Sequence, residues 1–468
     1  MRVPRWGRAL VGLLPALGRV TVVAQSPVLV TGATVIDGTG AAPIPDAVIV
    51  IEGNRITAVG PRTVVAVPSG ARRIDAAGKF VIPGLMDANV HLILMMSIEF
   101  HARYEGHYED LIEEAAQVTL RNGVTTVFDS WGPLQPLMSV RDRIKRGEVV
   151  GSRIFVAGNI VGLTGPLDRD MNPQAAAAST APFRNRVNAI YTENVGADLL
   201  WKTPDQVRTE VRKYIARGID FLKYAAAGHG TGNLNFLMFS PEAQRAIVEE
   251  AHRAGIIAQT HTESVESLRQ AIEAGIDMGQ HMEVTGPEPM PESTLKAMLD
   301  RKIFAGVQPM TQRRLKGAIG VMGPEWAKTL QAAADNEVRM LKAGVPLLMA
   351  SDGGLMDPDE TASNDPRAAV DLPFELHEGP FLWLRAMGEK GMKPMDALMA
   401  ATRNVAAAYH KLDQLGTLEK GKIADLVVLD ADPLADLENV RKISMVMKEG
   451  RLVDRDKLPL RKFLTAPR

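Results

Sequence analysis

The chain lacks cysteine altogether, and it also lacks an excess of charge of either sign. Without cysteine there is no disulfide, no thiolate metal site and no cysteine nucleophile, so a metal ion would have to be held by histidine, carboxylate, amide or modified lysine side chains. The 54 Lys plus Arg residues balance 55 Asp plus Glu residues, which leaves a net charge of −1. This balance does not favour nucleic acid as a partner, and we expect a small-molecule substrate instead.

A third absence is a long hydrophobic run, because no stretch after the N-terminal segment approaches the ~20 apolar residues of a membrane-spanning helix. We therefore expect no membrane span. The N-terminal segment, residues 1–26, has a basic start, a short apolar run and small residues up to Ala24. This pattern is typical of a secretory signal peptide and predicts a periplasmic or secreted protein. Arg19 interrupts the apolar run, and the alternative is an N-terminal extension of a cytoplasmic protein.

The rest of the chain predicts one large and one small domain. Apolar residues make up 46% and charged residues 23% of the 468 residues, a balance typical of a compact globular protein. Short alternating strands with Gly and Asn turns fill residues 27–82, and the same pattern returns in residues 412–468. We predict that these two segments pair into one small β-sandwich domain built from both chain ends.

Residues 83–411 alternate apolar strands with amphipathic helices. One helix is expected to begin with Ser240 as its cap and Pro241 at its first position. The eight expected strands are GLMDANVHL, TTVFD, RIFVAG, FLKYAAAG, IIAQTH, DMGQH, IFAGVQP and PLLMASD. Eight β-α units predict an α/β fold, a (β/α)8 TIM barrel, whose chemistry belongs at the C-terminal ends of the strands.

Metal-capable or ionisable side chains stand at the ends of these expected strands. They are Asn89, His91, Lys223, His261, His281 and Asp352. Asn89 and His91 are two residues apart, so they share one face of their strand, and Val90 between them faces the helices. A histidine that stands alone is usually structural, but six such residues at one end of a single barrel predict a functional site.

Lys223 lies in FLKYAAAG, a strand with few other polar residues. Burial inside a barrel lowers the pKa of a lysine amine. A neutral amine can take up carbon dioxide to form a carbamate, whose two oxygens can bridge two metal ions. Lys223 is therefore a candidate N6-carboxylysine.

The other histidines are assigned differently. His252 and His410 lie in helical stretches and are expected to be structural, whereas His377 has no assigned role. Loops after the first and fourth strands carry further histidines that could contact substrate, and solvated loop residues are the alternative. These are His101, His107 and His229. Together with Tyr224, which is next to Lys223, His229 is a candidate for orienting a substrate carbonyl or carboxylate.

Over nearly the whole length after the leader, the motifs resemble those of the amidohydrolase superfamily. GKFVIPGLMDANVHL resembles the first-strand motif of that family, NGVTTVFD the second and RAIVEEAHRAGIIAQTH the fifth. AGVPLLMASDGG resembles the eighth strand, and LGTLEKGKIADLVVLDADPL resembles the return to the small domain. The lysine in FLKYAAAG is similar to that of the branch with imidazolonepropionase-like and Xaa-Pro dipeptidase-like enzymes.

The resemblance implies a divalent metal cofactor, Zn²⁺ by preference, with one or two ions per subunit, and a homo-oligomer such as an octamer. It implies that His91, Asp352 and Lys223 hold one ion, and that Lys223, His261 and His281 hold the other. Most relatives carry histidine where this chain has Asn89. The Asn-x-His form resembles a smaller subgroup that includes phenylurea hydrolases, so we interpret Asn89 as an altered ligand of the first ion. An amide oxygen is a neutral, harder donor than imidazole, which predicts weaker binding there.

The expected activity is metal-dependent hydrolysis of a carbon–nitrogen bond, with Asp352, Lys223 and His229 as catalytic residues. Related sequences hydrolyse N-acyl amino acids and ochratoxin, so the expected substrate is an aryl amide, an ochratoxin-like N-acyl amino acid or a phenylurea. An Xaa-Pro dipeptidase-like peptidase is one alternative. A degenerate barrel retained for binding is an alternative of another class, and the intact Lys223, His261, His281 and Asp352 argue against it.

Overall fold

The computed structural model describes residues 26–93, 97–169, 171–229, 235–321, 324–355, 371 and 374–459. Apart from Ser26, the predicted leader lies outside the described residues. In the part of the chain that is described, no helix has the length and apolar character needed to cross a membrane.

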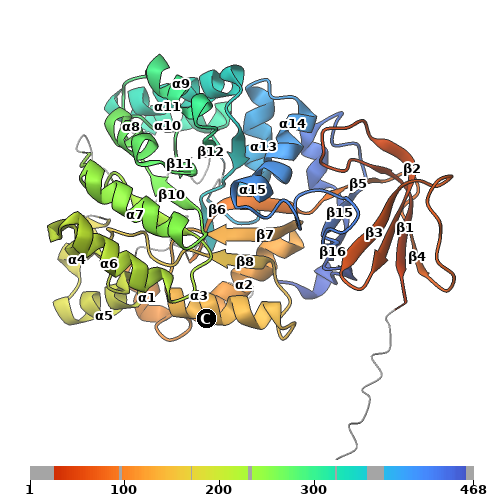
Figure 1. Cartoon of the computed structure of the whole chain (residues 1–468), viewed down its shortest axis with the longest axis horizontal. Helices are drawn as coiled ribbons and strands as arrows, with labels where there is room; N and C mark the ends of the chain where they lie inside the picture. The colour runs from red at the N-terminus through yellow and green to blue at the C-terminus, as the bar shows by residue number, and fades with distance from the viewer. Residues whose placement is uncertain are drawn as a thin grey trace, which may run out of the picture.

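Both ends of the chain build one eight-stranded sheet, the small domain at the right of Figure 1. Its strands are β1 (Val28–Val35), β2 (Ile44–Glu52), β3 (Arg55–Pro61), β4 (Arg72–Asp75), β5 (Phe80–Pro83), β15 (Leu426–Leu429), β16 (Ile443–Lys448) and β17 (Arg451–Leu452). Strand β5 joins the two chain ends, because it pairs in parallel with β1 and antiparallel with β15. Alternate residues of these strands, such as Val30, Ile49, Val81 and Leu426, form a separate buried core. The prediction of one β domain built from both ends is confirmed.

The middle of the chain supplies the barrel, and each of its strands lies within one residue of one of the eight predicted stretches. They are β6 (Leu85–Ile93), β7 (Val124–Asp129), β8 (Arg153–Val156), β9 (Leu222–Ala225), β10 (Ala258–His261), β11 (Met278–Gln280), β12 (Phe304–Val307) and β13 (Leu347–Met349). The ladders within the runs β6–β8 and β9–β13 are parallel.

Two backbone contacts join these runs into a ring. Val161, which follows β8, forms a parallel bridge with Tyr224 of β9. At the other join, the Asp352 N–H after β13 donates to the Asn89 carbonyl of β6 at 2.8 Å. The TIM-barrel prediction is confirmed. A short strand that was not predicted, β14 (Gly353–Leu355), follows Asp352 and pairs in parallel with β6.

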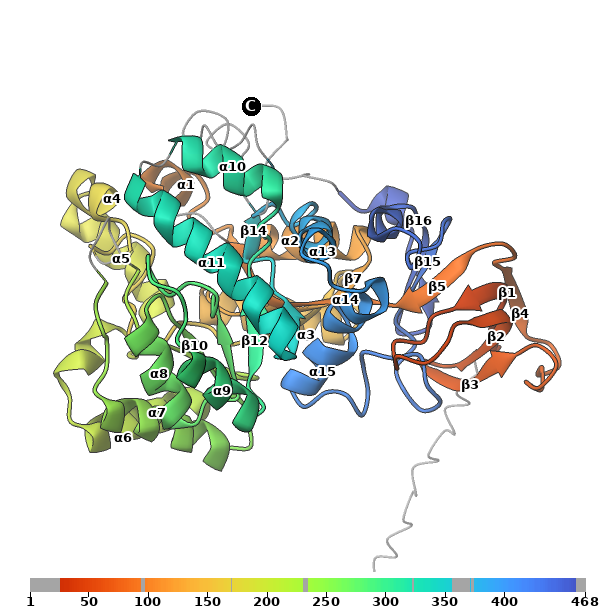
Figure 2. The ribbon, with the colours of Figure 1, turned by 90° about the horizontal axis from the view of Figure 1, so that it is seen from above.

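Helices surround the barrel in two views (Figure 1 and Figure 2). The α-helices are α1 (Ile98–Arg103), α2 (Tyr108–Arg121), α3 (Leu134–Lys145), α4 (Pro173–Ala178), α5 (Ala181–Thr192), α6 (Pro204–Ile215), α7 (Pro241–Arg253), α8 (Val265–Ala274), α9 (Glu292–Asp300), α10 (Gln312–Val321), α11 (Pro324–Ala343), α13 (Gly379–Glu389), α14 (Pro394–Ala400) and α15 (Arg403–Ala408). Short 3₁₀ helices are η1 (Ala197–Trp201), η3 (Leu437–Arg441) and η4 (Arg455–Lys457). The α7 prediction is confirmed, because the Ser240 side chain accepts from the Ala243 N–H and Pro241 is the first helical residue.

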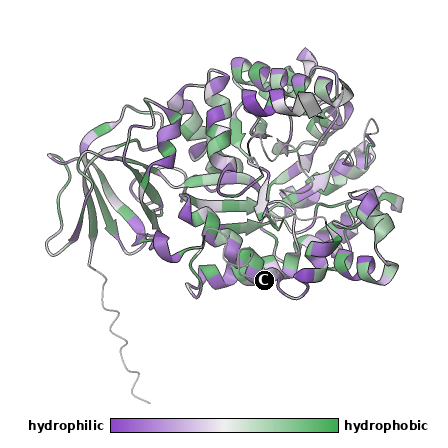
Figure 3. Cartoon of the chain, turned by 180° about the vertical axis from the view of Figure 1, so that it is seen from behind, coloured by the Kyte–Doolittle hydropathy of each residue, from purple (hydrophilic) through white to green (hydrophobic). Residues whose placement is uncertain are grey.

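Apolar residues close the end of the barrel opposite the candidate site. Tyr409, which follows α15, stacks on Phe128 with ring centroids 3.6 Å apart and donates to the Ala88 carbonyl at 2.6 Å. Phe221 and Ile257 precede β9 and β10 and belong to the same buried cluster. Figure 3 shows the hydrophobic colouring of the interior strands against the mixed colouring of the surrounding helices. The opposite, C-terminal ends of the strands are therefore the place for polar chemistry.

Candidate active site

The structure brings the six predicted residues to the C-terminal half of the barrel. Asn89 and His91 lie on β6, Lys223 on β9, His261 ends β10, His281 follows β11, and Asp352 lies three residues after β13. All but Asp352 are buried, with 0–7% of their surface exposed. Val90 packs in the core that the barrel strands share with the helices, as predicted from the alternation of the strand.

The Asp352 carboxylate is the centre of this cluster. Its Oδ1 accepts from Asn89 Nδ2 at 2.7 Å and lies 3.1 Å from His91 Nε2 and 3.7 Å from His281 Nε2. Burial raises the pKa of Asp352, but His281, His91 and Lys223 outweigh that effect and hold the pKa well below its usual value. The carboxylate is therefore ionised at neutral pH.

Asn89 connects this carboxylate to Lys223. While its Nδ2 donates to Asp352, its Oδ1 accepts from Lys223 Nζ at 3.4 Å. Lys223 is 1% exposed, and burial lowers the pKa of its amine to about 8. A substantial neutral fraction is therefore present near neutral pH, as predicted from the apolar strand.

His91 and His281 are neutral for the same reason. Burial lowers the pKa of His281 to about 3 and also lowers the pKa of His91. Neutral imidazole is the form that binds a metal ion. His91 Nδ1 lies 3.2 Å from the Trp131 carbonyl, which fixes the ring so that Nε2 points at Asp352.

The backbone at two of these positions is in the left-handed region. His281 and Asp352 both have φ of 57°. This conformation is unfavourable for residues with a side chain and persists where the surrounding structure enforces it. At Asp352 the enforcing contact is the hydrogen bond from its N–H to the Asn89 carbonyl. The turn directs the carboxylate at His91 and His281.

A second group of side chains lies next to this cluster. The rings of His229 and His261 stack with centroids 4.1 Å apart, and His261 meets the His281 ring edge-on at 5.2 Å. Glu263 Oε1 lies 3.3 Å from His261 Nε2. One potential ligand atom from each of His229, His261 and Glu263 lies within 4.8 Å of the others.

The sequence did not indicate four polar residues in or beside the site. Glu263 is one, and Gln308 after β12 is another, because its Nε2 donates to Asp352 Oδ2 at 2.8 Å. Asp87 of β6 accepts from the Asn89 and Ser351 N–H groups, and Asp129 at the end of β7 accepts from the Leu92 N–H. Asp87 and Asp129 could have been found from the sequence, because each is a carboxylate in a largely apolar strand.

Three candidate substrate contacts lie elsewhere in the structure, and exposed His107 agrees with the alternative of a solvated residue. His101 is not in a loop, because it lies in α1, is 0% exposed and pairs with the Tyr108 hydroxyl at 3.0 Å. His107 points to Asp110 at the exposed start of α2. The Tyr224 hydroxyl donates to Gln244 of α7, so this side chain faces away from the site.

Two of the three remaining histidines have partners outside the cluster. His252 on α7 pairs with Asp277 at 2.8 Å, which agrees with a structural role. His377 lies 3.3 Å from Glu375. His410 follows α15 and is exposed. None of these contacts supplies a further group to the candidate site.

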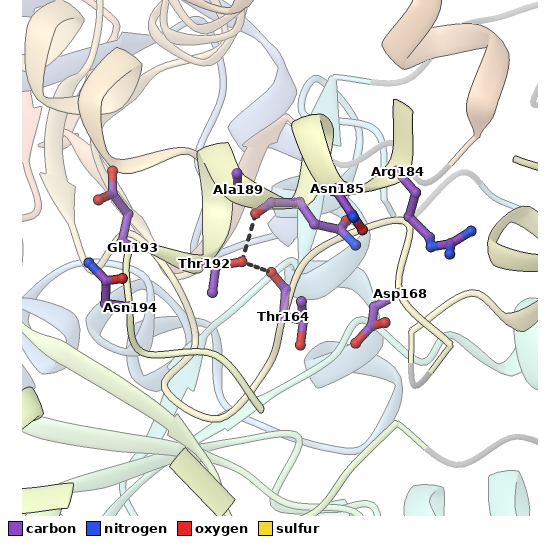
Figure 4. A pocket seen from close by; sticks show the side chains of 9 residues that line it. Thr164, Asp168, Arg184, Asn185, Ala189, Thr192, Glu193 and Asn194 are labelled. Carbon is purple, nitrogen blue, oxygen red and sulfur yellow. Dashed lines mark hydrogen bonds between the residues drawn. The ribbon is translucent and has the colours of Figure 1, made fainter. Parts of the chain in front are cut away.

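A polar cavity of about 410 Å³ lies beside α5 (Figure 4). Asp168, Arg184, Asn188 and Glu193 are among its lining residues, whereas the six predicted site residues are not. Thr192 Oγ1 donates to the carbonyls of Thr164 and Asn188 at its wall. The cavity is thus separate from the histidine cluster.

Comparison with known proteins identifies the family. The family model described as "Amidohydrolase family" matches residues 80–453. Molinate hydrolase has a similar solved structure, with 41% identity, a TM-score of 0.90 and coverage of 95% of this chain and 98% of that chain. Phenylurea hydrolase B has 36% identity, a TM-score of 0.90 and coverage of 95% and 100%.

A curated relative supports the same family. Ochratoxinase from Aspergillus niger is 26% identical over 439 residues, which cover 88% of this chain and 83% of the relative. The family model covers most of the chain, and the predicted resemblance is confirmed. The chain belongs to the amidohydrolase family and is a hydrolytic enzyme.

Proposed function

We propose that the protein hydrolyses a carbon–nitrogen bond of an amide or urea in a small molecule, with one or two divalent metal ions, Zn²⁺ by preference. The observation that carries the proposal is the convergence of Asn89, His91 and His281 on the Asp352 carboxylate, with Lys223 against Asn89. The names molinate hydrolase, phenylurea hydrolase and ochratoxinase support a small-molecule substrate.

The donor set fits a divalent ion. His261 is 2% exposed, yet neither of its ring nitrogens makes a hydrogen bond to the described residues. Buried polar atoms normally have such a partner, and a metal ion can serve as one. Six residues are proposed to hold the metal: Asn89, His91, Lys223, His261, His281 and Asp352. A bound ion supplies Lewis acidity that polarises a carbonyl and acidifies a water molecule.

The side chains of the protein supply the proton transfers. Asp352 is ionised, so it can accept a proton from the attacking water and pass it to the leaving nitrogen. Gln308 and Asn89 hold the two carboxylate oxygens in place. The partly buried ring of His229 stacks on His261 and is close enough to this cluster to orient a substrate carbonyl.

A substrate panel combined with metal analysis tests the function. We expect the purified protein to contain one or two equivalents of divalent ion and to hydrolyse a member of a panel of anilides, phenylureas, N-acyl amino acids and dipeptides. Removal of the ion should abolish turnover, and its return should restore it. Turnover of dipeptides alone would favour the Xaa-Pro dipeptidase alternative. Tight binding of panel members without turnover would favour the degenerate binding protein.

Asn89→Ala tests the altered ligand. The substitution removes an amide that contacts both Asp352 and Lys223, so we expect the affinity for one ion to fall about ten- to hundredfold, the range for groups that support a metal site. Activity should fall with occupancy and recover when divalent ion is added. Asn122→Ala, at the end of α2, is the matched control. Full metal content and activity without added ion would show that Asn89 is not part of the site.

Four further features belong to the same proposal. We propose the carboxylated form of Lys223, the export of the protein after removal of residues 1–26, and a homo-oligomer such as an octamer. We also propose a division into a barrel over 83–411 and a small domain over 27–82 and 412–468. The burial of Lys223 and the lowered pKa of its amine support the first, and the pairing of β5 with β15 supports the last.

A further inference from the structure

The strand that carries His91 leaves its regular pairing with β7 just before this residue. In the ladder between β6 and β7, Asp87 lies opposite Val127 and Val90 lies opposite Asp129, with an irregularity between these two pairs. A bulge of this kind disrupts the ladder locally and redirects side chains. On the β7 side, the position of His91 therefore depends on contacts other than regular strand pairing.

The Asp129 carboxyl group supplies one of these contacts. Asp129 ends β7, is 0% exposed, and its Oδ2 accepts from the Leu92 N–H at 2.8 Å. That N–H belongs to the peptide bond directly after His91, so the Asp129 side chain holds the backbone of this residue. Burial raises the pKa of Asp129 to about 8, although the N–H groups of Leu92 and Trp131 act in the opposite direction. At neutral pH the side chain therefore provides an acceptor oxygen more than a negative charge.

Trp131 contacts the other side of His91, and Asn159 holds Trp131. The Trp131 carbonyl lies 3.2 Å from His91 Nδ1, and the two rings meet edge-on with centroids 6.0 Å apart. The indole Nε1 of Trp131 donates to Asn159 Oδ1 at 3.1 Å. Because Trp131 is 3% exposed and Asn159 is 0% exposed, this hydrogen bond is shielded from water. It restrains the residue whose carbonyl faces His91.

Asn159 is itself fixed by the chain around it. Its Nδ2 donates to the Leu163 carbonyl at 2.7 Å, and its backbone N–H donates to the Tyr214 hydroxyl at 2.7 Å. Tyr214 in turn donates to the Ala157 carbonyl at 2.7 Å. Both ends of the Asn159 amide are thus bonded to protein groups, so this residue acts on the site through Trp131.

We propose that Asp129 and Asn159 are positioning residues that hold the metal ligand His91 from two sides. Asp129 fixes the backbone of His91, and Asn159 fixes Trp131, whose carbonyl orients the imidazole ring. Contacts of this kind set the orientation of a ligand and the affinity for its ion. The inference rests on the proposed metal-dependent function and gives a role to two residues outside the set of metal ligands.

Cobalt binding to the full-length protein provides the test. Metal-free wild type, Asp129→Ala, Asp129→Asn and Asn159→Ala are titrated with Co²⁺. The stoichiometry, the dissociation constant, the visible absorption spectrum and a thermal unfolding curve are recorded for each. Asp277→Ala is the matched control, because Asp277 Oδ2 also accepts a strand N–H, that of Ala258 at 2.8 Å, but at the start of β10, the end of the barrel away from the site. The spectrum reports the ligands of the ion independently of activity.

We expect Asp129→Ala and Asn159→Ala each to weaken binding of one Co²⁺ by at least about tenfold, the smallest loss typical of groups that support a metal ligand, and to change the spectrum. Asp129→Asn keeps an acceptor oxygen for the Leu92 N–H and should stay near the wild type. Asp277→Ala should lower the unfolding temperature without changing the affinity or the spectrum. A loss in Asp129→Asn as large as that in Asp129→Ala would contradict the role given to Asp129.

Trp131→Phe is a second route to the same bond, because it removes the indole N–H and keeps the backbone carbonyl. It should reproduce the effect of Asn159→Ala, and the double variant should lose no more than either single variant. These two variants decide the proposal if Asp129→Ala fails to fold. If both keep the wild-type affinity and spectrum, the proposal is wrong, whereas the proposed function stands as long as turnover by the wild type is metal-dependent. Metal-independent turnover by the wild type would overturn both.

Discussion

Asp352→Asn should lower kcat by at least ~10², the low end of what a positioned acid–base group contributes, while the protein stays folded. The amide that replaces the carboxylate cannot accept the proton of water at neutral pH. Its size is unchanged, and the contacts from Asn89 and Gln308 show that the side chain is held at both oxygens. Turnover measured with the best substrate of the panel, together with a thermal unfolding curve, checks the result.

A metal measurement separates proton transfer from metal binding in this variant. If Asp352 acts mainly as a base, the variant should retain its metal content at saturating divalent ion and remain slow. Asp335→Asn on α11 is the matched control, because this exposed carboxylate accepts from Gln331 and does not belong to the candidate site. Near-normal turnover of Asp352→Asn at full metal content would remove Asp352 from the mechanism.

The pH dependence of turnover should reflect the low pKa of Asp352. Because the neighbouring His281, His91 and Lys223 hold its pKa well below the usual value, the carboxylate should remain charged throughout the range in which the protein is folded. No acid limb between pH 5 and 7 should therefore arise from Asp352. Any limb in this range that persists when the metal is saturating would have to come from another group.

The barrel and the six residues were predictable because their signals are local. An apolar strand that ends in a polar residue, repeated eight times with helices between, specifies both the fold and the end of the barrel where chemistry occurs. Lys223 could be identified from its own strand, since nothing polar surrounds it in sequence. Its burial and lowered pKa follow from that strand.

The missed residues depend on contacts that are distant in sequence. Gln308 reaches Asp352 across 44 residues, and Glu263 meets His229 only because β9 and β10 are adjacent. Glutamate and glutamine in loops are common, so their identity alone carries little information. Strand β14 was missed because SDGGL has no alternating apolar pattern, and it forms by pairing with β6.

The assignments of His101 and Tyr224 were wrong for reasons that lie in the sequence next to each residue. His101 was assigned to a loop because α1 has six residues, too few for a helical period to be recognised, although Ser97 caps it. Tyr224 could have been excluded from the sequence alone, because successive residues of a strand point to opposite faces. With Lys223 facing the barrel interior, Tyr224 has to face α7, where its hydroxyl meets Gln244.

The largest loss of metal binding and turnover is expected when Lys223 is replaced. Its amine serves both as the proposed site of the carbamate and as the partner of Asn89. Burial lowers the pKa to about 8 from the ordinary 10.5, so roughly a tenth of the amine is neutral at pH 7. The neutral amine adds to the carbon of carbon dioxide, an N–C bond forms and one proton is released. At constant dissolved carbon dioxide, activation of metal-free protein by bicarbonate and metal should therefore accelerate up to about pH 8 and level off above it.

Lys223→Ala should abolish metal binding and turnover, and added divalent ion should not restore either. The loss should exceed the ~100-fold typical of groups that only support a ligand, because the substitution removes both the proposed bridge and the partner of Asn89. Lys223→Gln fills more of the buried space and tests whether the loss is simply a packing defect. Both variants should lack the bicarbonate dependence, whereas Lys213→Ala, at an exposed position of α6, should retain it. A Lys223→Gln protein that binds its ions and turns over substrate would show that the metal site forms without a carbamate at this position.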